Sequence, residues 1–169
     1  MRNNYDELIA RLREKQGNSK PYRVLALDLG VKIIGLAIYD SRINISLPFG
    51  HIKSDGKSMS NFEKIIRISS IVNSESLDTV VIGLPLEKSG AIGDISRSIL
   101  EFAEKLAETL DISVVTYDER FSSRLADRML RDLGHLNRKK RNILDNEVAA
   151  TIILNDFIQL ISKKLGVIT

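Results

Sequence analysis

The sequence predicts an α/β fold in which a mixed five-stranded sheet carries helices on both faces. In the second half of the chain, β-branched apolar runs alternate with segments whose apolar residues recur at helical spacing. This alternation predicts parallel strands joined by helices. Near the start, the apolar runs 23–28 and 35–39 lie so close together that they predict a hairpin, which makes the sheet mixed. The predicted order is β-β-β-α-β-α-β-α-α.

A short amphipathic helix is expected before the first strand. Leu8, Ile9 and Leu12 recur at helical spacing within segment 4–16, and residues 17–21 have the composition of a linker. We therefore expect residues 1–20 to form an N-terminal helical extension and linker, and residues 21–169 to form one domain. The third strand, 45–52, contains Pro48, which predicts an edge position or a bulge.

The later elements follow from their periodicity and end signals. Ser60 and Glu63 have capping-box spacing at the start of a helix, and Gly134 is placed to close another. After the third strand, the predicted elements are a helix that begins after residue 60, a buried strand over 79–84, a helix over 94–110, a strand over 112–117, a helix over 122–133 and a last helix over about 145–165.

Composition excludes several classes of protein. The chain has 169 residues, 43% hydrophobic and 28% charged, which is typical of a soluble globular protein. It has no cysteine, so disulfides and thiolate metal sites are excluded. This is compatible with a reducing cytoplasm, which is the location we expect. Residues 1–20 lack the apolar core of a signal peptide, and no run is long enough to span a membrane. The net charge of +3 permits a polyanionic partner.

Acidic residues stand where predicted strands end. Asp28 ends the first strand, Glu119 follows the last strand, and residues 145–147 open the predicted last helix. Ligands of open α/β sheets bind beyond the carboxyl ends of the strands, so these acids can converge. Converging carboxylates repel each other, and a divalent cation relieves that repulsion.

Each of these acids also has a purely structural interpretation. Asp28 could accept hydrogen bonds in a turn, and Asp145 fits a helix N-cap. Glu119, or Asp118 before it, could cap the next helix or pair with Arg120. The functional interpretation depends on the three sites occurring together.

Four segments, in order, resemble motifs of the YqgF/RuvX family. They are Asp28–Gly35 for the DxGxKxxG opening, Gly83–Leu86 for the GLP(L) segment, Asp118–Ser123 for DER(L/F)(S/T)(S/T), and Ala149–Leu154 for the AAxxIL helix. The resemblance runs from about Tyr22 to Ile161. It implies a ribonuclease-H-like fold, shared with Holliday-junction resolvases, and a metal-dependent nuclease that processes the 5′ end of the 16S ribosomal RNA precursor.

The resemblance also implies the site. The expected acids fall on Asp28 and Glu119, with Mg²⁺ or Mn²⁺ as cofactor. At the third acidic position this chain has Asn146, flanked by Asp145 and Glu147. We take Asp28, Glu119 and Asp145 as the catalytic residues, and the same three with Asn146 as the metal ligands. Asparagine offers an oxygen ligand without charge, so a second ion would be held more weakly.

Phosphate contacts are expected around this site. The residues predicted to contact phosphates of the nucleic acid are Gly30, Lys32, Arg120, Arg138, Lys139, Lys140 and Arg141. A solvated turn lysine and a solvated basic loop are the structural alternatives. Aromatic residues make up 5% and tryptophan is absent, which favours backbone or shape recognition over base stacking.

Three other functions compete with this interpretation. The Asp28–Gly35 segment also resembles the phosphate loop of actin-like ATPases, but those proteins clamp nucleotide between two such domains. Asn146 favours a non-catalytic nucleic-acid binder or regulatory protein. A resolvase acting on branched DNA is the third alternative. The predicted partner is pre-16S ribosomal RNA or branched DNA, and not a membrane.

Overall fold

The computed structural model describes residues 5–54, 58–87, 89–119 and 138–166, without the side chains of 138–143. One five-stranded sheet has the order β3-β2-β1-β4-β5. β1 pairs antiparallel with β2, and β2 with β3, whereas β1 and β4, and β4 and β5, are parallel. The mixed sheet is therefore confirmed. The strands are β1 (Arg23–Leu29), β2 (Ile33–Asp40), β3 (Ile45–Lys53), β4 (Thr79–Leu84) and β5 (Ser113–Asp118).

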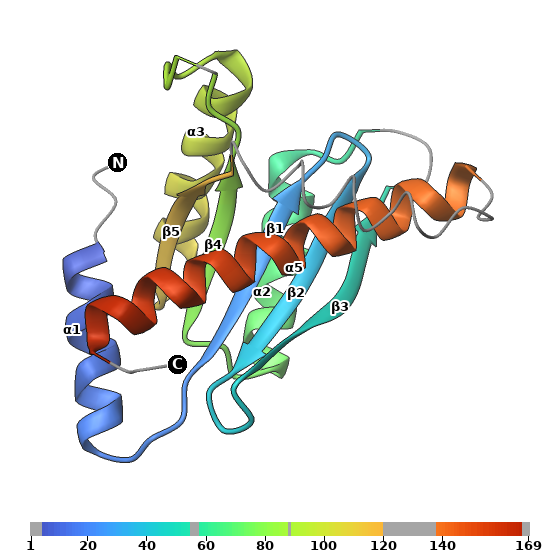
Figure 1. The fold of residues 1–169 in the computed structure, drawn as a ribbon. Helices are drawn as coiled ribbons and strands as arrows, with labels where there is room; N and C mark the ends of the chain where they lie inside the picture. Colours follow the sequence, from blue (N-terminus) through green and yellow to red (C-terminus); the bar gives the residue numbers. More distant parts are fainter. Residues whose placement is uncertain (1–4, 55–57, 88, 120–137, 167–169) are drawn as a thin grey trace.

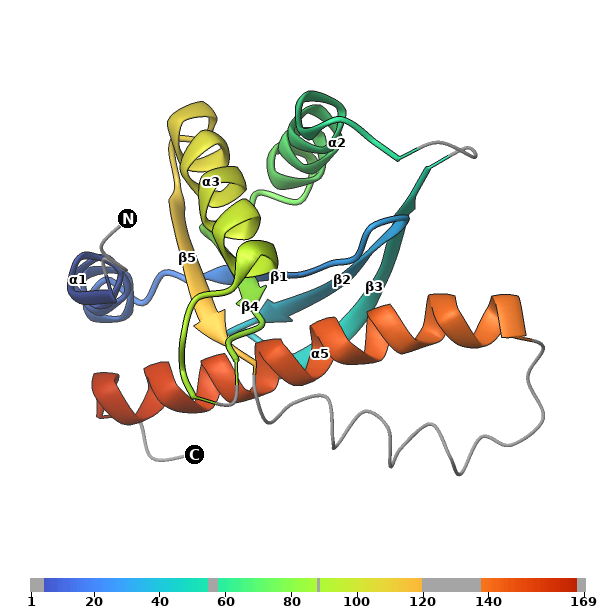
Figure 2. The ribbon, with the colours of Figure 1, turned by 90° about the horizontal axis from the view of Figure 1, so that it is seen from above.

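Helices lie on both faces of the sheet, as predicted. Figure 2 shows α2 and α3 on one face and the long helix α5 on the other. The helix α1 lies beside the C-terminal part of α5, near the β5 edge (Figure 1). The described helices are α1 (Tyr5–Gly17), α2 (Asn61–Ser74), α3 (Asp94–Thr109) and α5 (Arg138–Leu165).

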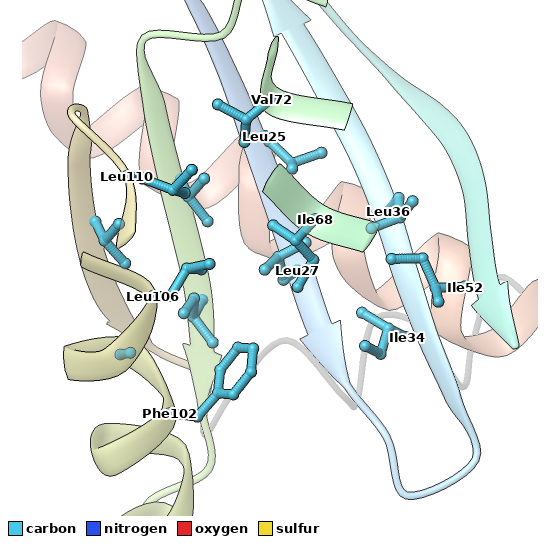
Figure 3. Close-up of a cluster of buried hydrophobic side chains, with 14 of the residues drawn as sticks. Leu25, Leu27, Ile34, Leu36, Ile52, Ile68, Val72, Phe102, Leu106 and Leu110 are labelled. Atoms are coloured by element: carbon cyan, nitrogen blue, oxygen red, sulfur yellow. The ribbon is translucent and has the colours of Figure 1, made fainter. Parts of the chain in front are cut away.

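Alternating residues of each strand feed two separate hydrophobic cores. In β1, Leu25 and Leu27 pack under α2 and α3, with Ile68 and Phe102 as helical partners (Figure 3). Val24 and Ala26 belong to the core under α5. Successive strand side chains point to opposite faces, so Asp28 points toward the α5 side.

The α5-side core also includes α1. Leu8 and Leu12 of α1 are almost fully buried and cluster with Phe157 of α5. The Tyr5 hydroxyl donates a hydrogen bond of 2.7 Å to the Thr116 carbonyl in β5. The predicted N-terminal helix therefore exists and packs on the sheet and on α5.

β3 is an edge strand with a bulge, as Pro48 predicts. Its register against β2 shifts between Leu36 and Ala37, and Pro48 has no N–H to contribute to the ladder.

The start of the last helix was predicted wrongly. α5 begins at Arg138, so Asp145 lies inside the helix and is not its N-cap. Segment 138–141 is helical and not a loop. No glycine or proline interrupts residues 138–148, and Leu144 and Val148 pack on Ile152 along one stripe, which extends the helix toward its N-terminus. The predicted helix 122–133 lies outside the described residues.

Candidate active site

Two glycines flank Asp28 in the sheet. Gly35 of β2 is its register partner on one side. On the other side Leu27 pairs with Ile82 of β4, so Asp28 and Gly83 are the next residues along two parallel strands. Asp28 therefore lies between two positions that have no side chain, which leaves space beside it on the α5 face.

Glu119 fills the space over Gly83. It follows β5, and its backbone N–H donates to the Leu84 carbonyl at 3.3 Å. A Cβ atom on Gly83 would overlap the Glu119 carboxylate and the Ile153 side chain of α5. The glycine thus makes room for the acid and for α5 together.

The backbone of α5 fills the space over Gly35. A Cβ atom on Gly35 would overlap the Asn146 carbonyl and would lie 2.9 Å from the Glu147 nitrogen. The Asn146 side chain lies near the β1–β2 turn, with its Oδ1 3.1 Å from a Cβ atom placed on Gly30. Asp28 is therefore bracketed by Glu119 on one side and by the Asn146 turn of α5 on the other.

Burial raises the pKa of both acids, and the charge of Asp28 adds to the effect on Glu119. Burial raises the pKa of Asp28 from 3.8 to about 6. Burial, followed by the negative charges of Asp28 and Asp118, raises the pKa of Glu119 from 4.5 to about 7. Both shifts disfavour the charged carboxylates, and a cation bound between them would reverse that effect.

A groove of about 390 Å³ adjoins the bracketed acid. Its lining residues come from the β1–β2 turn and from α5: Gly30, Val31, Lys32, Ile33, Asp145 and Asn146. Lys32 is exposed and forms no ion pair with any described residue. The groove thus holds carboxylate and amide oxygens opposite a cation, an arrangement suited to a phosphate and a metal ion.

A histidine fastens α5 to the sheet beside this groove. His51 of β3 shares a 2.8 Å hydrogen bond, through Nδ1, with Glu147 Oε1. This bond ties Glu147 to β3 and leaves Asp145 and Asn146 as the residues of this turn that line the groove.

The structure brings together some of the predicted site residues. Asp28 and Glu119 interact, and Asp145, Asn146, Gly30 and Lys32 line one groove. Within the described residues no three His, Asp or Glu side chains form a metal-binding cluster, so Asp145 as a ligand stays a prediction. Arg120 and the side chains of Arg138, Lys139, Lys140 and Arg141 lie outside the described residues.

Sequence reasoning missed three contributors. Gly35 and Gly83 stood inside recognised motifs, but their role depends on what packs above them. The pairing of His51 with Glu147 joins residues 96 positions apart, and nothing local in the sequence indicates it.

Among the described residues, no helix is long and apolar enough to cross a membrane.

The fold is ribonuclease-H-like, with paired carboxylates at the carboxyl edge of its sheet. It resembles RuvC from T. thermophilus in complex with a Holliday junction substrate, at a TM-score of 0.53 and 11% identity, over 82% of this chain and 96% of that one. It also resembles the fowlpox virus Holliday junction resolvase, at a TM-score of 0.51 and 16% identity, over 81% and 98% of the two chains.

Within this class, the chain belongs to the RuvX family. The family model, described as "Holliday junction resolvase", matches residues 22–160. A relative from Caldanaerobacter subterraneus subsp. tengcongensis is 38% identical over 80% of this chain and 95% of its own length. One from Bacillus cereus is 35% identical over 80% and 97%. Both relatives carry the name "Putative pre-16S rRNA nuclease".

Proposed function

We propose that this protein is a nuclease that hydrolyses phosphodiester bonds near the 5′ end of the 16S ribosomal RNA precursor. The observation that carries the proposal is the pair of half-buried carboxylates, Asp28 and Glu119, held at the carboxyl edge of the sheet by two glycines. The names of its relatives supply the substrate. A cytoplasmic location follows from that substrate.

The residues present fit a divalent cation. The charge of Asp28 makes Glu119 harder to ionise, and the carboxylate oxygens of both residues are the hard ligands that Mg²⁺ and Mn²⁺ prefer. Asn146 of α5 can supply a further oxygen ligand for the ion. Its backbone packs on Gly35, which pairs with Asp28 in the sheet. When bound, the ion would polarise the scissile phosphate and lower the pKa of a water molecule.

The protein's own residues position the substrate. Lys32 attracts a phosphate into the groove beside Asn146. Gly30 lets the β1–β2 turn close tightly beside Asn146, because a side chain there would overlap the Ile33 carbonyl and crowd Asn146. When a divalent cation binds, the carboxylates of Asp28 and Glu119 would hold it.

The test is cleavage of an RNA that carries the 5′ leader of 16S ribosomal RNA, compared with a four-way DNA junction, in Mg²⁺ and in Mn²⁺. We expect the RNA to be cut and both Asp28→Asn and Glu119→Gln to lower the rate by at least about a hundredfold. Asp156→Asn removes another partly buried acid, on α5 beside Tyr117, and serves as the matched control. Full activity in Asp28→Asn would refute the proposal, and cutting of the junction alone would make the protein a DNA resolvase.

A second pair of variants identifies the oxygen that α5 contributes. If Asn146 is the third ligand, Asn146→Asp adds a charge and tightens Mn²⁺ binding measured by calorimetry, while Asp145→Asn changes it little. The opposite pattern would assign the ligand to Asp145.

A further inference from the structure

A second pocket lies across the β1–β2 turn from the site groove. It has a volume of about 260 Å³ and is formed where α2 and α3 begin, above the end of β1. It is lined by Leu29, Gly30, Val31, Ser58, Asn61, Lys64, Ile95, Ser98, Ile99 and Phe102. Figure 3 shows Phe102 at the end of the core where β1 turns into β2.

This pocket adjoins the candidate active site. Gly30 and Val31 line both the pocket and the groove that contains Asn146. Leu29, on its wall, directly follows Asp28 in β1. The two hollows thus meet over one turn, on opposite faces of the same sheet edge.

The chemistry of the pocket differs from that of the groove. Val31 and Ile95 are 76% and 71% exposed at its mouth, and Ile99 and Phe102 are buried behind them. Between these apolar side chains lie the Asn61 amide and the hydroxyl groups of Ser58 and Ser98. Exposed aliphatic side chains around a hollow commonly mark a binding site.

A cation lies on the same wall. Lys64 lines the pocket and forms no ion pair with any described residue. Together with Lys32 in the groove, it places one unpaired positive charge in each hollow, within the part of the chain that the structure describes. A strand that crosses the turn would find a cation for its phosphates on both sides.

We propose that this pocket receives one unpaired nucleobase of the substrate strand, next to the phosphate that Lys32 attracts into the groove. A base has apolar faces and a polar edge, which match the aliphatic walls and the amide and hydroxyl groups of the pocket. Because a paired base cannot leave its stack without cost, the pocket selects substrate that is single-stranded at this nucleotide. The inference rests on the proposed function for the position of the phosphate.

Binding in EDTA tests the pocket without any cleavage. Wild-type protein is titrated at low salt with labelled leader RNAs in which each nucleotide in turn is abasic. We expect one abasic position to weaken binding by about tenfold, which corresponds to about 1.4 kcal/mol. Ile95→Ala should weaken binding of the intact RNA similarly and abolish the abasic effect. Phe62→Ala removes a side chain that is equally exposed, at 72%, but does not line the pocket, and should bind as wild type does.

The outcomes separate this proposal from the proposed function. Equal binding of all the abasic RNAs, or an abasic effect that survives in Ile95→Ala, would overturn the base pocket even if the RNA is cleaved. An RNA that is bound with the expected abasic pattern but never cut in Mg²⁺ or Mn²⁺ would overturn the nuclease and leave the base pocket standing.

Discussion

Asp28 lies between two strand positions that lack side chains, and this determines what can approach it. Over Gly83 the vacant volume is filled by the Glu119 carboxylate, and over Gly35 by the backbone of α5 at Asn146. Neither glycine has a positive φ angle, so close approach and not backbone conformation explains both residues. The two glycines therefore shape the site by leaving space, Gly83 for the Glu119 carboxylate and Gly35 for the backbone of α5.

Replacing Gly83 with alanine should damage the site. The added Cβ would overlap the Glu119 carboxylate and Ile153, so one of them must move. We expect cleavage to fall by at least about tenfold and the free energy of unfolding to fall by about 1–3 kcal/mol. Gly17→Ala adds the same atom in open space and should leave activity unchanged. Wild-type activity in Gly83→Ala would contradict the assigned position of Glu119.

The raised pKa values of Asp28 and Glu119 make a prediction about metal-free protein. The folded state holds protons on these acids up to about pH 6 and 7, whereas the unfolded chain releases them near pH 4. Between those limits the folded state binds more protons, so their contribution to stability is greatest below pH 4 and is lost as the pH rises to about 7.

Asp28→Asn should therefore be more stable than wild type in EDTA at pH 8, by on the order of 2–3 kcal/mol, and the difference should shrink toward pH 4. Urea unfolding at several pH values measures this. An Asp28→Asn protein that is less stable than wild type at pH 8 would show that the carboxylate is already satisfied without a cation.

Among the elements, α5 contributes most to the site, although it is a helix and the two acids stand at the ends of strands. It spans Arg138–Leu165 and packs on β1, β2 and β3. Gly35 allows its close approach, and the bond between His51 and Glu147 fixes the rotation of the turn that carries Asn146. The position of Asn146 is thus determined from β2 and β3 together.

The role of His51 in positioning Asn146 can be separated from its effect on the free energy of unfolding. His51→Ala removes the bond to Glu147, while His51→Asn can keep a nitrogen donor near the Nδ1 position. Because the pair is partly exposed, we expect less than about 1 kcal/mol of lost stability. Mn²⁺ affinity and kcat should nevertheless fall about fivefold in His51→Ala and recover in His51→Asn. Equal values in all three proteins would mean that the bond does not position Asn146.

The elements also show where sequence reasoning worked and where it failed. Apolar periodicity predicted α1, the hairpin and the central strands, and Pro48 predicted the edge position of β3, since each depends on local residues. The start of α5 was missed because Asp145 resembles an N-cap, while the stripe through Leu144 and Val148 continues the helix before it. The family motifs identified Asp28 and Glu119. The contacts that hold α5, at Gly35 and at His51, are long-range, so no local sequence pattern indicates them.

In the whole molecule, one end of the sheet collects the acids, the groove and the pocket. β1, β4 and β5 run parallel and end there, and α2 and α3 begin there (Figure 1). Lys32, in the β1–β2 turn, lines the groove, and Lys64 of α2 lines the pocket on the other face. The charge of this end is therefore arranged for a polyanion that passes over the turn, despite a net charge of only +3.

This arrangement predicts the salt dependence of binding. Lys32→Ala and Lys64→Ala should each reduce the slope of log affinity against log salt by about 0.7 for single-stranded RNA, as expected for one lost phosphate contact. Lys105→Ala, on the exposed side of α3, is the control and should not change the slope. An unchanged slope in Lys32→Ala would remove this residue from the substrate path.

The most direct test of the account is a crystal of the protein soaked with Mn²⁺ and measured for anomalous scattering. We predict an anomalous peak between the carboxylates of Asp28 and Glu119, close to Asn146, that disappears in Asp28→Asn. A map without a peak at that position, or with the two carboxylates turned away from each other, would contradict the proposed metal-dependent nuclease.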